Sequence, residues 1–181
     1  RGLSLLKKKK SESICIVQTA GARHKQQLNN TTRKRKRMRD TKIYEALTYD
    51  DVLLVPQYSE IESRSQISLA TDMGKGFVLG LPIIASPMDT ISEAPMCRAL
   101  DIAGGTAIVH RYNTIDEQVE IVEEAFEKGT RTLGAAIGVT GDYLERAIAL
   151  HDAGVRVLCV DVAHGHHILV QTAVNRLKET F

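Results

Sequence analysis

The chain has 181 residues, of which 43% are hydrophobic and 25% charged, and its formal net charge is only +2. No stretch approaches the ~20 consecutive apolar residues of a membrane-spanning helix, so the composition excludes a membrane protein and indicates a soluble one. The three cysteines, Cys15, Cys97 and Cys159, are odd in number and widely spaced. This argues against a disulfide framework or a zinc site and indicates a reducing compartment, so we expect a cytoplasmic protein.

Charge is divided unequally at Met38. Residues 1–37 hold twelve Lys or Arg, including the runs KKKK and RKRKR, against one acid, Glu12, which gives this leader about +11 and the remaining residues about −9. The leader has no sustained apolar period and no secretory h-region, so we expect it to be disordered. It is interpreted as a nuclear-localisation or nucleic-acid-binding arm, as an organellar transit peptide, or as translated upstream sequence that is not native protein. The last is favoured because the chain begins at Arg1 and Met38 precedes the first globular-looking segment.

The first strand of the body is predicted at 81–85, LPIIA, because its lack of alternation is typical of a strand buried on both faces of a parallel sheet. A compact polar turn, SPMDT at 86–90, follows at the carboxyl end of this strand, where α/β sheets bind their ligands. Ser92 is predicted to be the N-cap of the next helix, with Glu93 favoured there by the helix dipole. The unit is therefore strand, candidate site turn and helix.

Three further strand–helix units are predicted, each with an apolar run followed by residues at helical spacing. The strands are expected at 106–110, 133–139 and 157–163, and the helices begin at Thr114, at Asp142 and after Gly165, with Gly129 and Gly154 ending the first two. Four such units in about 100 residues imply right-handed crossovers and parallel strands, as in an α/β barrel or a doubly wound sheet.

Length decides how much of a barrel these units make. A (β/α)8 TIM barrel takes roughly 250 residues, so residues 38–181 are interpreted as the N-terminal half of one, in a chain truncated from a longer protein. The alternative is a genuine short domain that dimerises or forms an open sheet. Either would expose apolar strand edges and helix faces unless another segment covered them.

Residues after the four expected strands are predicted to face one rim. They are Ser86, Met88 and Asp89 in the first unit, His110 and Arg111 in the second, Thr140 in the third, and Asp161, His164, His166 and His167 in the fourth. The two carboxylate oxygens of Asp161 suit a ribose diol or a nicotinamide amide, whereas the plainer alternative is a helix cap or an ion pair with Arg111. The three histidines are not expected to bind a metal, because no carboxylate or cysteine completes a ligand pattern.

Five segments of residues 43–181 occur in a specific combination: LTYDDVLLVPQYSEIESRSQISL, LPIIASPMDTISEAPMCRAL, GGTAIVHRY, GAAIGV and VDVAHGHH. Together they resemble the family of inosine monophosphate (IMP) dehydrogenase and guanosine monophosphate (GMP) reductase. The resemblance implies a (β/α)8 barrel, tetrameric when complete, that binds a purine nucleoside monophosphate and a nicotinamide cofactor above the strand ends.

The same resemblance implies roles for individual residues. Ser86 and Met88, in the turn that also holds Asp89, would bind the nucleotide. The nicotinamide riboside end of the cofactor would be held by Asp161, Val162 and Ala163, and its phosphates would be approached by Arg111. Ser63 and Arg64 match a segment that reaches a cofactor in the sister enzyme. The family's catalytic cysteine attacks C2 of the purine from a loop after the sixth strand. That loop lies beyond Phe181, so no catalytic residue is expected in this chain, which should be inactive alone.

The two sister enzymes are separated by opposing features. The SPMDT turn resembles the dehydrogenase, which oxidises IMP to XMP with NAD in guanine nucleotide synthesis. The HRY and VDVAHGH segments resemble some reductases, which convert GMP to IMP with NADPH, and the regulatory CBS insert usual in the dehydrogenase is absent between residues 129 and 133. We favour the dehydrogenase because the turn contacts substrate, whereas the insert is dispensable for barrel chemistry. The alternative of another class is a non-enzymatic binding or assembly module, with nucleic acid as a partner only if the basic leader is native.

Overall fold

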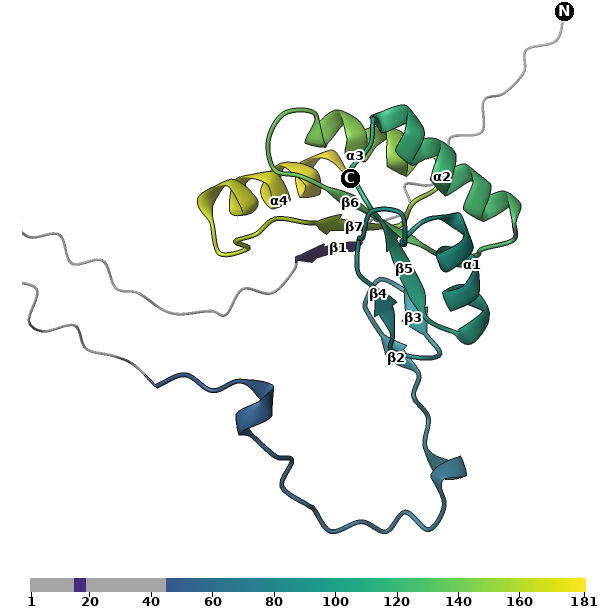
Figure 1. The fold of residues 1–181 in the computed structure, drawn as a ribbon, viewed down its shortest axis with the longest axis vertical. Coiled ribbons are helices and arrows are strands. Elements are labelled where there is room, and N and C mark those ends of the chain that lie inside the picture. The colour runs from purple at the N-terminus through teal and green to yellow at the C-terminus, as the bar shows by residue number, and fades with distance from the viewer. Residues whose placement is uncertain (1–14, 19–44) are drawn as a thin grey trace, which may run out of the picture. The chain divides into compact units, whose positions relative to one another are not determined.

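The computed structural model describes residues 15–18 and 45–181 (Figure 1). These residues fall into two units, one comprising 45–68 and the other comprising 15–18 with 69–181. The remaining residues, including most of the basic leader, lie outside the described part of the chain.

The larger unit is built on a parallel sheet in the order β1-β7-β6-β5-β4. Its strands are β1 (Cys15–Gln18), β4 (Ile84–Ala85), β5 (Thr106–Val109), β6 (Gly134–Ile137) and β7 (Val157–Val160). Every residue of β5, β6 and β7 is buried, which is typical of parallel strands covered on both faces. The prediction of an α/β fold with parallel strands is confirmed.

Four helices alternate with these strands (Figure 1): α1 (Ala94–Ala103), α2 (Ile115–Glu127), α3 (Tyr143–Asp152) and α4 (Ile168–Thr180). The predicted N-cap Thr114 is confirmed, because its hydroxyl accepts from the Glu117 amide while its own amide and hydroxyl donate to the Glu117 carboxylate. These hydrogen bonds lower the pKa of Glu117. Gly129 and Gly154 follow the ends of α2 and α3 at φ values of 86° and 102°, where glycine is unstrained.

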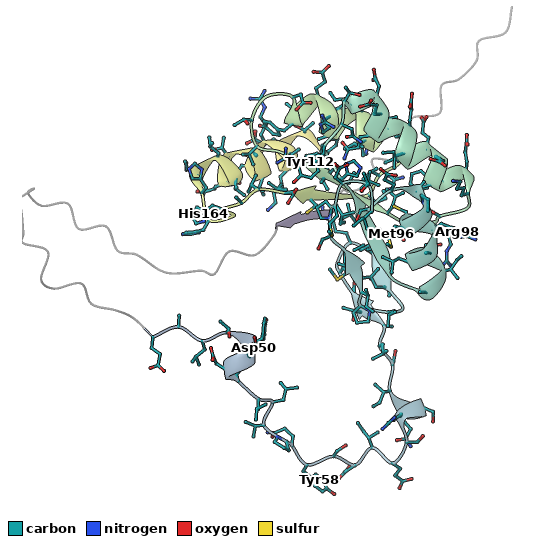
Figure 2. All side chains as sticks on the ribbon, viewed as in Figure 1. Asp50, Tyr58, Met96, Arg98, Tyr112 and His164 are labelled. Atoms are coloured by element: carbon teal, nitrogen blue, oxygen red, sulfur yellow. The ribbon has the colours of Figure 1, made fainter. Side chains whose placement is uncertain are left out.

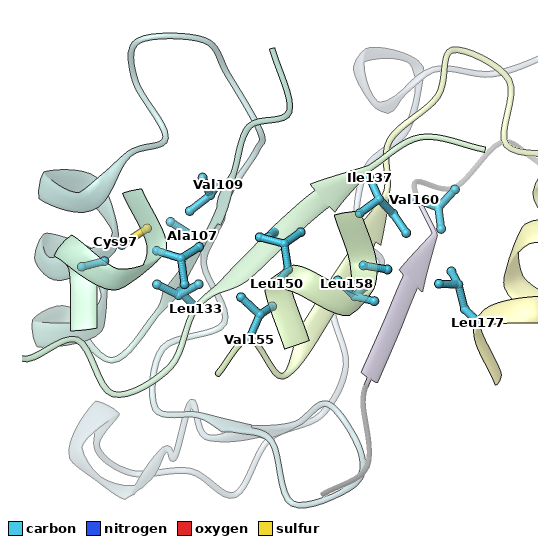
Figure 3. Close-up of a cluster of buried hydrophobic side chains, with 14 of the residues drawn as sticks. Cys97, Ala107, Val109, Leu133, Ile137, Leu150, Val155, Leu158, Val160 and Leu177 are labelled. Atoms are coloured by element: carbon cyan, nitrogen blue, oxygen red, sulfur yellow. The ribbon is translucent and has the colours of Figure 1, made fainter. Parts of the chain in front are cut away.

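All four helices pack on one face of the sheet. The main core joins Cys97 of α1, Leu150 of α3 and Leu177 of α4 to alternate strand residues such as Val109, Ile137 and Leu158 (Figure 3). Val122 of α2 belongs to the same core. The intervening strand residues Ile108, Ala136, Val157 and Cys159 form a smaller cluster. A doubly wound sheet places helices on both faces, so these four units follow a different arrangement.

The smaller cluster is covered by a hairpin that the sequence analysis did not identify. Strands β2 (Thr71–Asp72) and β3 (Val78–Leu79) pair antiparallel, and Phe77 packs against the cluster. Gly74, Lys75 and Gly76 all have positive φ, and the Asp72 carboxylate accepts from the Gly74 amide at 2.7 Å. An Asp followed by two closely spaced glycines is a recognisable turn signal.

The predicted buried strand at 81–85 is wrong in length and burial. Only Ile84–Ala85 forms a strand, and Ile83 is 50% exposed. Within the described residues β4 stands at the edge of the sheet and pairs only with β5. An apolar run is buried on both faces only when neighbouring elements cover it, and here such cover is incomplete.

The disorder predicted for the leader is wrong for residues 15–18, which form β1. This strand pairs in parallel with β7, from Cys15 opposite Val157 to Gln18 opposite Val160. The segment CIVQ contains two β-branched residues, and the outer edge of β7 offers backbone groups that need hydrogen-bond partners. The outer edge of β7 is therefore covered by β1; the other leader residues lie outside the described part.

The second unit, residues 45–68, is extended apart from two short 3-10 helices, Tyr49–Asp51 and Arg64–Gln66. Its large apolar side chains, including Tyr49, Leu53 and Leu54, are exposed. Across 15–18 and 45–181, no helix combines the length and apolar character needed to cross a membrane.

Candidate functional site

The connections that leave the carboxyl ends of β4, β5 and β7 meet through side-chain contacts, as the parallel sheet predicts. Figure 2 shows Tyr112 in the connection before α2 and His164 in the connection before α4. The predicted rim residues therefore come from separate strands to one edge of the sheet.

His110 joins the SPMDT turn to the end of β5. Its Nε2 lies 3.3 Å from Glu93 Oε1 and 3.9 Å from Asp89 Oδ1, and its ring is buried. Its Nδ1 accepts a hydrogen bond from the Tyr112 amide at 3.2 Å, so the neutral ring carries its proton on Nε2 and donates toward the carboxylates. The sequence placed His110 on the rim but gave no sign of its partner Glu93.

The SPMDT turn is held from its own backbone. The carbonyl oxygen of Met88 accepts from the amides of Ile91 and Ser92 at 3.2 and 2.9 Å, and the Ser92 hydroxyl donates to the Ser86 carbonyl. The prediction that Ser92 is the N-cap of α1 is wrong: the N-cap is Glu93, because the Ser92 hydroxyl is used inside the turn. The side chains of Ser86, Met88 and Asp89 are left exposed.

Arg111 reaches from the end of β5 to the end of β7. Its Nε and Nη2 donate to the backbone carbonyl of Asp161 at 3.2 and 3.0 Å, and Nε lies 3.8 Å from the Asp161 carboxylate. Its Nη1 lies over Gly138, at the end of β6, 3.6 Å from where a Cβ would stand. The ion pair between Asp161 and Arg111, one of the two plainer alternatives from the sequence, is therefore present. The other alternative, a helix cap by Asp161, is wrong, because the N-cap of α4 is His167, whose Nδ1 accepts from the Leu169 amide.

Asp161 keeps accepting capacity despite this pair. Its side chain is 23% exposed, and the 3.8 Å approach to Arg111 is longer than a hydrogen bond. Val162 is half-buried and Ala163 exposed directly after it. These three residues present a carboxylate beside a small apolar surface.

The three histidines before α4 stand apart from one another. The ring of His164 lies 6.5 Å from that of His166 and 6.4 Å from that of His167, measured between centroids. Within the described residues, no group of three or more His, Cys, Asp or Glu side chains is arranged to hold a metal ion. The expectation of no metal site stays a prediction.

Cys97 and Cys159 are buried, free thiols. Burial raises the pKa of both to about 11, and at Cys159 the nearby Asp161 charge adds to this rise. Neither thiol has the lowered pKa of a nucleophilic cysteine.

Ser63 and Arg64 belong to the other unit. The Ser63 hydroxyl accepts from the Ser65 amide at the start of the helix Arg64–Gln66. The cofactor role that the resemblance implies for these two residues stays a prediction.

Most of the chain is similar to known proteins. The model of the IMP dehydrogenase / GMP reductase domain matches residues 46–181. An inosine-5'-monophosphate dehydrogenase of Cryptosporidium parvum is 31% identical over 178 residues, covering 75% of this chain and 44% of that protein. One from Nitrosopumilus maritimus (strain SCM1) is 40% identical over 98 residues, 54% of this chain and 21% of the relative. A GMP reductase of Leishmania donovani is 41% identical over 80 residues, 44% of this chain and 16% of that protein. The chain spans less than half the length of these relatives.

Proposed function

Because the chain belongs to the IMP dehydrogenase / GMP reductase family, we propose that it is part of a purine-nucleotide oxidoreductase that oxidises IMP to XMP with NAD. The observation that carries this proposal is the set of side-chain contacts that joins the turns at the carboxyl ends of β4, β5 and β7. His110 ties the turn assigned to the nucleotide to β5, and Arg111 ties β5 to the Asp161 turn assigned to the cofactor. Two ligands bound at these turns would lie on the same edge of one sheet.

We also propose that residues 69–181 contribute the N-terminal half of a (β/α)8 barrel. Four consecutive parallel strands and helices on a single face of the sheet support this arrangement. In a barrel, one face of the strands packs against the outer helices and the other against side chains in the interior. The large cluster here joins the strands to the helices, and the small cluster lies on the opposite face of the strands. The complete enzyme would be a cytoplasmic homotetramer.

The exposed SPMDT side chains suit a polar nucleotide. Ser86 offers a hydroxyl, Met88 a soft apolar surface for the purine ring, and Asp89 an acceptor for a ribose hydroxyl. The turn's backbone hydrogen bonds keep these groups in place before a ligand arrives, which lowers the ordering cost of binding.

The donor and acceptor groups at β5 and β7 fit a nicotinamide cofactor. The Asp161 carboxylate can accept from a ribose diol or a carboxamide, and the half-exposed Arg111 guanidinium favours a phosphate. A nicotinamide cofactor bound there would supply the acceptor for the hydride that leaves C2 of the purine. The residues described here bind and orient the two partners, while water supplies the oxygen added at C2.

The covalent step requires a reactive thiol, and neither Cys97 nor Cys159 is suited to supply it. Cys97 and Cys159 are buried, and their raised pKa values keep them protonated at neutral pH. The nucleophile would come from a later loop of the longer protein, so the chain alone is predicted to be inactive.

A GMP reductase is the second candidate. Residues 128–133 alone connect α2 to β6, where the resemblance places a regulatory insert in most dehydrogenases. Similarity to the Leishmania reductases also supports it. Its cofactor would be NADPH, which would supply the hydride added to C2 as ammonia leaves.

Nucleotide-dependent turnover by the longer protein that carries these residues tests the assignment. We expect NADH to form from IMP and NAD, with XMP as the second product. NADPH oxidation that requires GMP, without the first reaction, would assign the reductase instead. Absence of both reactions would reject the oxidoreductase proposal.

A further inference from the structure

A buried polar cluster lies behind the rim, between α2 and α3. Arg146 of α3 is only 7% exposed. Its Nη1 donates to Gln118 Oε1 at 2.8 Å and to the Thr114 carbonyl at 3.3 Å, and its Nη2 donates to the Asn113 carbonyl at 3.0 Å and to Asp142 Oδ2 at 2.8 Å. The two terminal nitrogens of the guanidinium therefore make four hydrogen bonds to three different segments.

Gln118 anchors this cluster to the strands. Its Nε2 donates to the Ala136 carbonyl of β6 at 3.0 Å and to the Val109 carbonyl of β5 at 3.4 Å. Its side chain is fully buried, so each of these polar groups needs a protein partner. Gln118, which accepts a hydrogen bond from Arg146, is thus itself held in place by β5 and β6.

The loop carbonyls that Arg146 binds belong to the residues just after Arg111 and Tyr112. At the other side of the turn, His110 is held by its contacts to Glu93 and to the Tyr112 amide. The turn that carries Arg111 is therefore held at both ends, at one end by the contacts of His110 and at the other by the guanidinium of Arg146.

We propose that Arg146 is a positioning residue that fixes the turn 110–114 and so holds Arg111 against Asp161. The fixing of the turn stands on the contacts alone; its consequence for cofactor binding rests on the proposed function. A planar guanidinium is required because a lysine ammonium cannot bind two diverging pairs of acceptors with the same geometry.

Backbone amide exchange of this chain tests the fixing of the turn. Arg146→Met keeps much of the side-chain length but removes every donor, and we expect exchange in 110–114 to accelerate at least about tenfold while β6 and β7 change little. Arg146→Lys should fall between Met and the native residue. The control is Arg131→Met. Arg131 lies before β6 and binds Asp101 of α1, so its substitution should leave the exchange of 110–114 unchanged.

A second variant covers the case in which Arg146→Met does not fold. Asp142 makes no side-chain cap hydrogen bond, so Asp142→Ala removes its contact to Arg146 without loss of a cap. It should accelerate exchange in the same turn by about threefold, since one of four hydrogen bonds is lost. Unchanged exchange at 110–114 in the folded variants, or equal acceleration through the whole sheet, would overturn the proposal.

The consequence for function is measured separately. In the longer protein, Arg146→Lys should raise the KM for the nicotinamide cofactor by about threefold or more and leave the KM for the nucleotide within about twofold. Faster exchange at 110–114 with an unaltered cofactor KM would keep the positioning role and reject the cofactor role of Arg111. Unaltered exchange would reject the positioning role whatever the kinetics.

Discussion

At the amino ends of the strands, Asp101 is 3% exposed and has two arginine partners, with Arg98 at 3.4 Å and Arg131 at 3.3 Å. Arg98, which projects from α1 (Figure 2), also donates to the Gly129 carbonyl, and Arg131 donates to the Asp101 carbonyl. At the carboxyl ends, the acids are left accessible: Asp89 is 65% exposed and Asp161 keeps its long approach to Arg111. Acidic side chains are therefore buried and paired with arginines at the amino ends of the strands, whereas at the carboxyl ends they keep oxygen atoms that a ligand can reach.

This difference separates stability from binding. A buried carboxylate that is paired with two arginines holds elements together, and its burial leaves little of it for a ligand to reach. The carboxyl-end acids are held in place by His110 and Arg111, yet remain reachable. Substitutions at the amino end should therefore change unfolding, and those at the carboxyl end should change ligand binding.

The largest effect is expected for Asp101→Ala. The substitution removes the shared partner of Arg98 and Arg131 from a buried position, and hydrogen bonds to charged groups contribute about 1.5–3 kcal/mol each. Because Arg131 is 76% exposed and can regain water, we expect a loss near the lower end, about 2 kcal/mol. Urea unfolding of the chain measures it, with Arg131→Met as the smaller matched change. A change below about 0.5 kcal/mol would show that this cluster does not stabilise the sheet.

Asp161→Ala should act in the opposite way. Loss of an acceptor for the cofactor should raise its KM at least about tenfold in the complete enzyme, which corresponds to about 1.4 kcal/mol, while nucleotide affinity stays within a few fold. Steady-state kinetics with each substrate varied in turn measures this. If the variant unfolds without a selective cofactor effect, the role of Asp161 is limited to its ion pair with Arg111.

How far the sequence predicts these two ends depends on the range of each interaction. The Thr114 cap follows from a local pattern, with Glu three residues later, and it is confirmed. The Arg111–Asp161 pair spans 50 residues and was foreseen only as an alternative, because the parallel strands bring both residues to one edge. Arg146 was missed, since a polar residue on an amphipathic helix gives no sign that it is buried.

The errors have a common physical origin in neighbours that a local pattern does not specify. Ile83 and Ile84 read as buried strand residues, yet their burial depends on covering elements. Likewise, nothing in CIVQ specifies that it pairs with β7, because that pairing crosses more than 130 residues of sequence.

Ser86→Ala sharpens the comparison within the carboxyl end. The hydroxyl is exposed and its loss leaves the turn's backbone hydrogen bonds intact, so stability should hardly change. One lost hydrogen bond of about 1 kcal/mol corresponds to roughly a fivefold weaker nucleotide affinity. Calorimetric titration of the complete enzyme with IMP measures it, and cofactor binding should be less affected than in Asp161→Ala. An equal loss for both ligands would contradict separate subsites.

The smallest effect is expected at the sheet edge covered by β1. Deleting residues 1–18 removes a four-residue strand, but it also removes the entropy cost of closing the long connection to the body, so we expect a net loss of about 0.5–1 kcal/mol, or roughly 2–4 °C in Tm. The exposed β7 edge should also increase self-association, measured by light scattering after size-exclusion chromatography. Deleting only residues 1–14 is the matched control, because it keeps β1 and should change neither quantity. If neither deletion changes the Tm or the association, β1 does not protect this edge, and the leader is dispensable as its composition predicts.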